Sequence, residues 1–197
     1  MKRKLSKTAF TFIIITCCLF SIGQAGEAKE FADGKIEIFF GPKEYGAKDS
    51  LEAELVDFIN QAKESLDISV QELDSEIIAQ AILNASQRKK AINPKRKLSI
   101  RIILEESYQL GESYDENRRI YMNLLRAGIR TRLDYNSKIM HDKFIIRDYN
   151  KEKEAVWLGS LNFTTTGAHK NYNNALIIRN HNIAKAYDLI KSQPHKQ

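Results

Sequence analysis

The chain has 197 residues, a length that fits one domain and is sufficient to bury a hydrophobic core without staples. With 43% hydrophobic and 28% charged residues its composition is that of a globular protein, and the absence of repeats and of biased segments excludes a low-complexity chain. The formal net charge is +6 at neutral pH, a value that depends strongly on the first residues of the chain.

Residues 1–25 have the pattern of a secretory signal peptide. Four basic residues come first, an apolar run follows over residues 9–22, and Gly23, Gln24 and Ala25 offer small residues where a signal peptidase cleaves. The apolar run is shorter than the ~20 residues that span a bilayer. We therefore expect export to the periplasm or beyond the cell, with an uncleaved membrane anchor as the alternative.

Removal of this segment changes two properties of the chain. Cys17 and Cys18 leave with it, so the mature protein would have neither a thiol nor a disulfide. Subtracting the four positive charges of Lys2, Arg3, Lys4 and Lys7 from +6 leaves +2. Net charge alone therefore does not argue for a nucleic-acid partner.

One α/β domain is expected over residues 35–192, with strands and helices alternating in its first half. The expected strands are 35–40, 66–73, 98–105, 129–133, 138–147, 155–160 and 174–179. The expected helices are 51–62, 75–88, 116–127 and 183–191, the first of them capped by Asp49 together with Glu52. This order favours a mixed, largely parallel sheet with helices on both faces.

A histidine and a lysine stand two residues apart on the expected strand 138–147. His141 and Lys143 would then point to the same face of the sheet. A phosphate between them would satisfy both side chains, because lysine supplies a point charge and imidazole can attack phosphorus or transfer protons near neutral pH. The pair therefore indicates chemistry on a phosphate.

Hydrogen-bond donors follow at the end of the next expected strand. Gly159 allows a close approach of the backbone. Ser160 and Asn162 can donate to the non-bridging oxygens of a phosphate and hold charge that develops in a transition state. A short helix expected after Phe163 would present further amides to an anion.

The two segments, HDKFIIRD and GSLNFT, resemble the HKD signature of the phospholipase D superfamily. From Lys35 onward the chain looks like the small members with a single motif, the secreted endonucleases of the Nuc type. The resemblance implies the phospholipase D/nuclease fold and hydrolysis of a phosphodiester bond.

The resemblance also implies a role for each matching residue. His141 would be the nucleophile that forms a phosphohistidine, and Lys143, Ser160 and Asn162 would bind the phosphate. Asp148 completes the catalytic motif but would lie back from the phosphate in a structural role. No metal or other cofactor is implied, because protein cations neutralise the phosphate, and no cluster in the sequence has metal-ligand spacing.

The family's site uses two copies of the motif, and this chain has one. A homodimer in which two copies of His141 meet at a two-fold axis would complete the site, and a piece of a longer two-motif protein is the alternative. The family often places an acidic residue in the final strand to orient the histidine, where this chain has Asn173. Glu72 and Glu105, at the ends of neighbouring strands, could substitute for it.

Three substrate hypotheses remain open. A nuclease is favoured by the chain's size, its single motif, the basic run at residues 88–97 and further arginines at 118, 119, 126, 130 and 132. A phospholipase D acting on phospholipid headgroups would need an apolar rim for contact with the membrane surface, for which Phe163 is a candidate. A non-catalytic binding module is the third.

Overall fold

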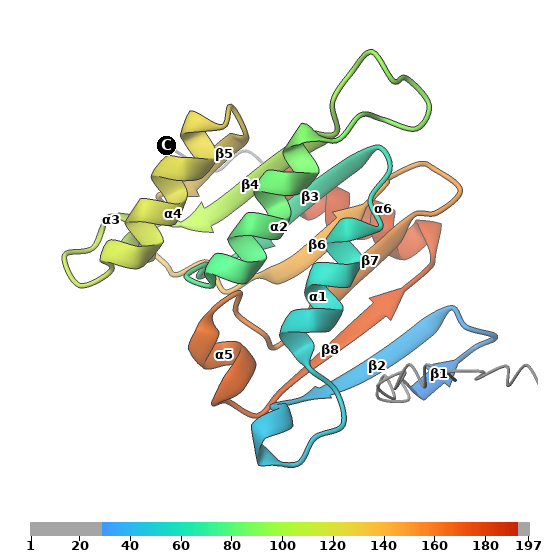
Figure 1. The fold of residues 1–197 in the computed structure, drawn as a ribbon, viewed down its shortest axis with the longest axis horizontal. Helices are drawn as coiled ribbons and strands as arrows, with labels where there is room; N and C mark the ends of the chain where they lie inside the picture. The colour runs from blue at the N-terminus through green and yellow to red at the C-terminus, as the bar shows by residue number, and fades with distance from the viewer. Residues whose placement is uncertain (1–28, 193–197) are drawn as a thin grey trace, which may run out of the picture.

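A computed structural model describes residues 29–192, which form one eight-stranded sheet flanked by helices (Figure 1). The strands are β1 (Lys29–Phe31), β2 (Ile36–Gly41), β3 (Ser65–Val70), β4 (Ser99–Glu105), β5 (Arg130–Asp134), β6 (Lys143–Arg147), β7 (Ala155–Gly159) and β8 (Asn173–Ile178). The helices are α1 (Leu51–Asn60), α2 (Glu76–Gln87), α3 (Glu106–Leu110), α4 (Asp115–Arg126), α5 (Thr165–His169) and α6 (His181–Ser192), with a short 3₁₀ helix, η1 (Lys43–Tyr45).

The strand order is β1-β2-β8-β7-β6-β3-β4-β5, and the sheet is mixed. The α/β class is confirmed, but the sheet is less parallel than expected, since only β3–β4 and β4–β5 pair in parallel among the described strands. A parallel pair needs a long crossover, which α2 and α4 provide. The turn after β6 is too short for a crossover, so β7 returns antiparallel to β6.

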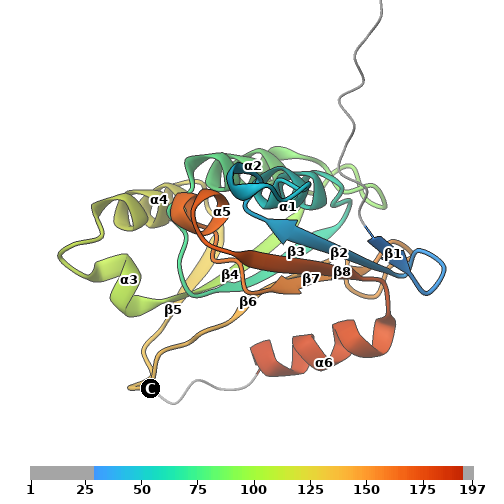
Figure 2. The same cartoon turned by 90° about the horizontal axis from the view of Figure 1, so that it is seen from below.

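Helices cover both faces of the sheet, as expected. Figure 2 shows α1, α2, α4 and α5 on one face and α6 on the other. The larger core lies under α1 and α2, where Trp157 of β7 contacts the rings of Phe39 and Phe58. A smaller cluster around Phe144 and Ile146 packs under α6. Because both faces are covered, every residue of β6 is buried.

Helix α1 begins at Leu51 as expected, but its cap is Ser50, one residue after the expected Asp49. The hydroxyl of Ser50 accepts a hydrogen bond from the amide of Ala53 and caps the helix. The carboxylate of Asp49 is turned away from the helix and accepts from the amide of Phe40. The expected cap at Asp49 is therefore wrong, because Asp49 instead ties the helix entry to β2.

The strand register brings the ends of several strands together along one side of the sheet. We call this side, where β3 and β7 end and β6 and β8 begin, the site edge. At this edge Val70 of β3 pairs with Lys143 of β6, and Gly159 of β7 pairs with Ala175 of β8. A Cβ atom at Gly159 would lie 2.3 Å from the carbonyl oxygen of Asn174, so this close approach requires glycine.

The opposite edge is held by Asp148, directly after β6. Its carboxylate is buried and accepts hydrogen bonds from the amides of Lys63, Glu64 and Ser65, at 2.7–3.0 Å. Five residues of extended strand separate it from Lys143 by on the order of 16 Å. These contacts fit the structural role expected for Asp148 and hold the start of β3 against the end of β6.

Within residues 29–192, no helix combines the length and the apolar character needed to cross a bilayer. The expected signal peptide at residues 1–25 lies outside the described residues.

The hydrogen bonds that Asp148 accepts give a stability prediction. Asp148→Ala should lower the free energy of unfolding by about 3 kcal/mol, because three backbone amides, that of Glu64 buried and those of Lys63 and Ser65 partly buried, lose their acceptor. Urea denaturation followed by circular dichroism measures the change. Glu152→Ala, in the exposed turn after β6, is the matched control and should shift stability by less than about 0.5 kcal/mol. An unchanged stability in Asp148→Ala would contradict the assigned role.

Candidate active site

His141 lies in the loop between β5 and β6, and its side chain is exposed at the site edge. The expected strand 138–147 is therefore wrong at its start, since β6 begins at Lys143. Main-chain contacts replace the strand there: the amide of Gln71 donates to the carbonyl of Asp142 at 2.9 Å. The Lys143 ammonium donates to the carbonyl of His141 at 3.0 Å. These two bonds hold the His141 backbone beside the end of β3.

Glu105 anchors the same loop from the end of β4. Its buried carboxylate accepts from the amide of Met140 at 2.7 Å and from the hydroxyl of Ser107 at 2.9 Å. Glu105 therefore fixes the residue that precedes His141 and contacts the main chain of the loop rather than the imidazole.

Lys143 and Asn162 meet at a residue that sequence reasoning did not single out. The side-chain oxygen of Gln71 accepts from the Lys143 ammonium at 2.9 Å and from the Asn162 amide nitrogen at 3.4 Å. All three side chains are at least partly buried, and Lys143 is only 8% exposed. A polar residue directly after the buried strand β3 was the available signal for Gln71.

The Lys143 ammonium is poorly solvated. Burial lowers the pKa of Lys143, while the nearby carboxylates of Asp142 and Glu72 act in the opposite direction. Burial also raises the pKa of Glu72, and Asp74 adds to that rise. Glu72 therefore lies near Lys143 as a half-buried carboxyl group.

Ser160 and Asn173 form a second pair across β7 and β8. The Ser160 hydroxyl donates to the side-chain oxygen of Asn173 at 2.8 Å and accepts from the amide of Asn174 at 3.1 Å. The Asn173 amide nitrogen in turn donates to the carbonyl of Gly167 at 2.8 Å. Asn173 thus orients Ser160, and within the described part of the chain it makes no hydrogen bond to His141. To donate to an anion, the Ser160 hydroxyl would have to rotate away from Asn173.

The turn between Ser160 and α5 carries Asn162 and Phe163. The side-chain oxygen of Asn162 is buried without a hydrogen-bond partner among the described residues. Phe163 is fully buried, and its amide donates to the carbonyl of Glu72 at 3.0 Å. The structure therefore overturns Phe163 as a candidate for an exposed apolar rim.

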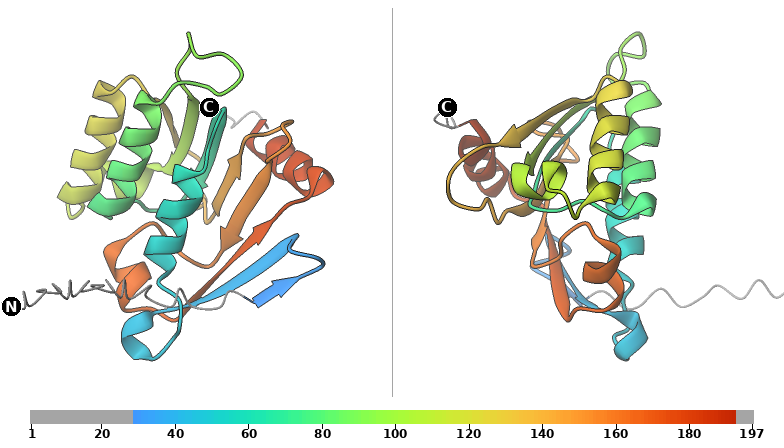
Figure 3. Two further views of the ribbon diagram at one scale, coloured as in Figure 1. Left: turned by 45° about the vertical axis from the view of Figure 1, so that its right-hand side comes forward. Right: turned by 90° about the vertical axis from the view of Figure 1, so that its left-hand side faces the viewer.

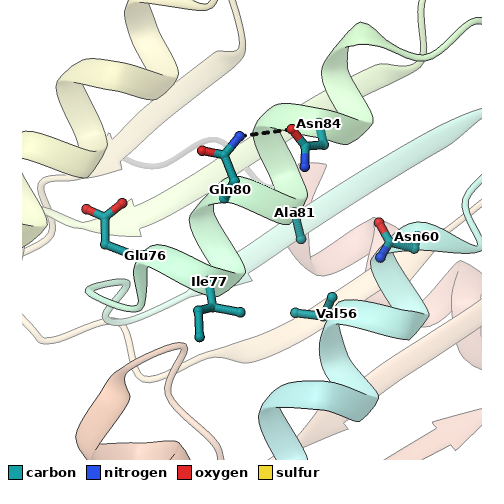
Figure 4. Close-up of a pocket in the computed structure, with 7 residues that line it drawn as sticks. All are labelled: Val56, Asn60, Glu76, Ile77, Gln80, Ala81 and Asn84. Atoms are coloured by element: carbon teal, nitrogen blue, oxygen red, sulfur yellow. Dashed lines mark hydrogen bonds between the residues drawn. The ribbon is translucent and has the colours of Figure 1, made fainter.

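A groove between α1 and α2 contains none of these side chains (Figure 4). It is lined by Val56, Asn60, Glu76, Ile77, Gln80, Ala81 and Asn84. Within residues 29–192, no group of three or more histidine, cysteine, aspartate or glutamate residues could hold a metal ion.

The site edge thus brings together four of the expected residues: an exposed imidazole, a buried ammonium, a hydroxyl and an amide. Lys143 begins β6 and His141 lies in the loop just before it, while Ser160 and Asn162 lie in the turn just after β7. Such a set can bind an anion, neutralise it with one cation and offer it a nucleophile or proton carrier. Asp148 lies at the opposite edge and takes no part in these contacts.

Comparison with known proteins identifies the family. Residues 55–190 match the family described as "Cardiolipin synthase, PLD-like domain". A protein named Phospholipase D from Rickettsia conorii is 30% identical over 129 residues, which cover 66% of this chain and 56% of that protein. The chain therefore spans little more than half the length of this relative.

Two solved structures share the fold. Nuc from Salmonella typhimurium, described as a phospholipase D family member, is 26% identical with a TM-score of 0.62, covering 79% of this chain and 90% of that one. NucT from Helicobacter pylori is 21% identical with a TM-score of 0.56, covering 80% and 93%. The second likeness shows the fold alone.

The contact between Gln71 and Lys143 predicts a shift in pH dependence. Anion binding needs the charged lysine, so it is present below the pKa of Lys143 and lost as the pH rises through it. Gln71→Glu places a carboxylate against the ammonium and should move that loss upward by about one pH unit. Calorimetric titration with inorganic phosphate across the alkaline range measures the midpoint.

Gln71→Leu is the matched control, since it removes the acceptor without adding charge and should not move the midpoint upward. The same midpoint in the wild type and in Gln71→Glu would mean that Lys143 is not the cation that holds the anion.

Proposed function

The chain belongs to the phospholipase D superfamily, and on that basis we propose that it is a metal-independent phosphodiesterase that works through a phosphohistidine at His141. One observation carries the proposal: the exposed His141 lies at the same sheet edge as the buried Lys143 and the donors Ser160 and Asn162. A phosphodiester held by these donors would have its phosphorus atom within reach of the imidazole.

In the first step an imidazole nitrogen of His141 attacks phosphorus and the bond to the leaving oxygen breaks. The leaving oxygen takes a proton from a second histidine. The Lys143 ammonium and a hydrogen bond from the Asn162 amide stabilise the negative charge on the non-bridging oxygens in the transition state. In the second step water attacks the phosphohistidine, the nitrogen–phosphorus bond breaks, and the second histidine recovers a proton from that water.

The second histidine is proposed to be the partner subunit's His141. Within residues 29–192 the remaining histidines are His169 and His181. His169 contacts Glu44 and Glu52, and His181 contacts Glu154. A homodimer with its two-fold axis at the site edge would bring two copies of His141 to one phosphate.

A nucleic acid is the proposed substrate class. The chain covers nearly the whole of the Nuc structure but only 56% of the Rickettsia Phospholipase D. The basic run at residues 88–97 does not support this choice, because it precedes β4 and so lies at the edge opposite the site. Arg118 and Arg119 also give little support to a nucleic-acid substrate, because both form ion pairs with acidic neighbours.

A phospholipase D acting on phospholipid headgroups is the second candidate. Tyr135 and Ile139 expose most of their side chains in the loop that carries His141, and Leu110 is exposed at the end of α3. Large apolar side chains beside a site could contact a membrane surface. A non-catalytic binding module remains the least favoured alternative, and export through residues 1–25 remains a prediction.

Purified protein should cleave plasmid DNA or RNA in EDTA, and His141→Ala should lower the rate by more than about 10³-fold. The loss follows from removal of the proposed nucleophile. Nuclease activity that survives in the variant would indicate a contaminant, and dependence on a divalent cation would contradict a metal-independent site. Choline release from phosphatidylcholine without nucleic-acid cleavage would select the second candidate.

The shared site predicts that activity follows dimerisation. Specific activity should fall on dilution in step with the dimer fraction measured by analytical ultracentrifugation, because a monomer holds only one of the two histidines. A strictly monomeric species with full activity would refute the assignment of two histidines to one site.

A further inference from the structure

Two exposed tyrosines make contact at the end of the site edge formed by β2 and β8. The ring centroids of Tyr45 in η1 and Tyr172 before β8 are 5.7 Å apart, and the rings are inclined by 43°. Tyr172 is 81% exposed and Tyr45 is 55% exposed. We call these two side chains, with the exposed lysines Lys43 and Lys170 beside them in the chain, the tyrosine patch.

The tyrosine patch is joined to the candidate active site by covalent and hydrogen bonds. Tyr172 directly precedes Asn173, whose side chain accepts from the Ser160 hydroxyl. On the other side, His169 at the end of α5 contacts Glu44 of η1 at 2.6 Å. Figure 3 shows η1 and α5 next to each other where β2 ends and β8 begins. The patch is therefore next in the chain to Asn173, the residue that orients Ser160, and is held by the contact between η1 and α5.

The chemistry of the tyrosine patch suits a stacked base. Two rings this exposed leave apolar area in water that a flat partner could cover. Lys43 and Lys170, each two residues from one of the tyrosines, add positive charge to the same segments, and within these segments Glu44 contacts His169. Aromatic faces next to cations bind single-stranded nucleic acid, in which the bases are free to stack and the backbone carries one negative charge per nucleotide.

We propose that the tyrosine patch is a binding subsite for single-stranded nucleic acid, which stacks a base of the substrate on Tyr172 and leads the adjacent phosphate to Ser160 and Lys143. This inference rests on the proposed phosphodiesterase function and names its substrate class. A paired duplex keeps its bases stacked on each other, so it cannot use the rings in the same way, and the subsite favours single strands.

The test compares, on the same variants, an oligonucleotide that can reach the tyrosine patch with a small phosphodiester that cannot. Tyr172→Ala should raise KM for a short single-stranded DNA oligonucleotide about tenfold, the loss expected for one stacked base. Its kcat/KM for bis(p-nitrophenyl) phosphate, which is too small to reach the patch, should stay within about twofold, and that turnover also shows that the variant is folded. Tyr172→Phe keeps the ring and should behave like the wild type.

Ile92→Ala is the matched control, because it removes another exposed large apolar side chain at the opposite edge of the sheet. It should change neither substrate's kinetics. Fluorescence anisotropy of the labelled oligonucleotide gives a second readout that does not depend on turnover, and Tyr172→Ala should weaken binding by a similar factor.

The outcomes separate this inference from the proposed function. Failure of the wild type to cleave bis(p-nitrophenyl) phosphate would overturn the phosphodiesterase, while the anisotropy comparison would still test the patch. Equal oligonucleotide binding by the wild type and Tyr172→Ala would overturn the subsite. Dissociation of a dimer in Tyr172→Ala would also overturn the subsite, by assigning the patch to a subunit interface. Loss of activity in Tyr172→Ala on phosphatidylcholine vesicles alone would overturn it by assigning the patch to a membrane surface.

Discussion

The site depends on the hydrogen bonds made by one buried ammonium group, that of Lys143 at the site edge. The antiparallel pairing of Val70 with Lys143 places the lysine beside Gln71, directly after β3. Gln71 then accepts hydrogen bonds from both Lys143 and Asn162. A charged group is costly to bury without partners. The fold offsets part of that cost with two neutral acceptors, the side-chain oxygen of Gln71 and the carbonyl of His141, and with the nearby carboxylates of Asp142 and Glu72.

The remainder of the sheet maintains this arrangement from a distance. Asp148 at the opposite edge fixes the register between β3 and β6 through three amides. Gly159 allows β7 and β8 to approach closely enough for Asn173 to orient Ser160. The four side chains with the proposed chemistry are therefore positioned by residues that do not meet the phosphate, and a small shift of register would separate them.

Much of this arrangement could be predicted from sequence because the motif spacing is local. His141 and Lys143 are two positions apart, and so are Ser160 and Asn162, which is enough to place the four residues near each other once their strands are adjacent. Gln71 could not be predicted as their common partner, since its role depends on a pairing between residues 73 positions apart, Val70 and Lys143. The start of β6 was misplaced for a similar reason: Glu105 holds Met140 in a loop through a contact that no local pattern encodes.

The phosphohistidine mechanism fixes the order of bond making at phosphorus: His141 attacks first and water attacks second. Hydrolysis of a phosphorothioate diester of known configuration in heavy-oxygen water reports that order, because each in-line displacement inverts the phosphorus centre. Attack by His141 followed by attack by water gives two inversions, so we expect overall retention of configuration. Overall inversion would show a single direct attack by water and would contradict the phosphohistidine at His141.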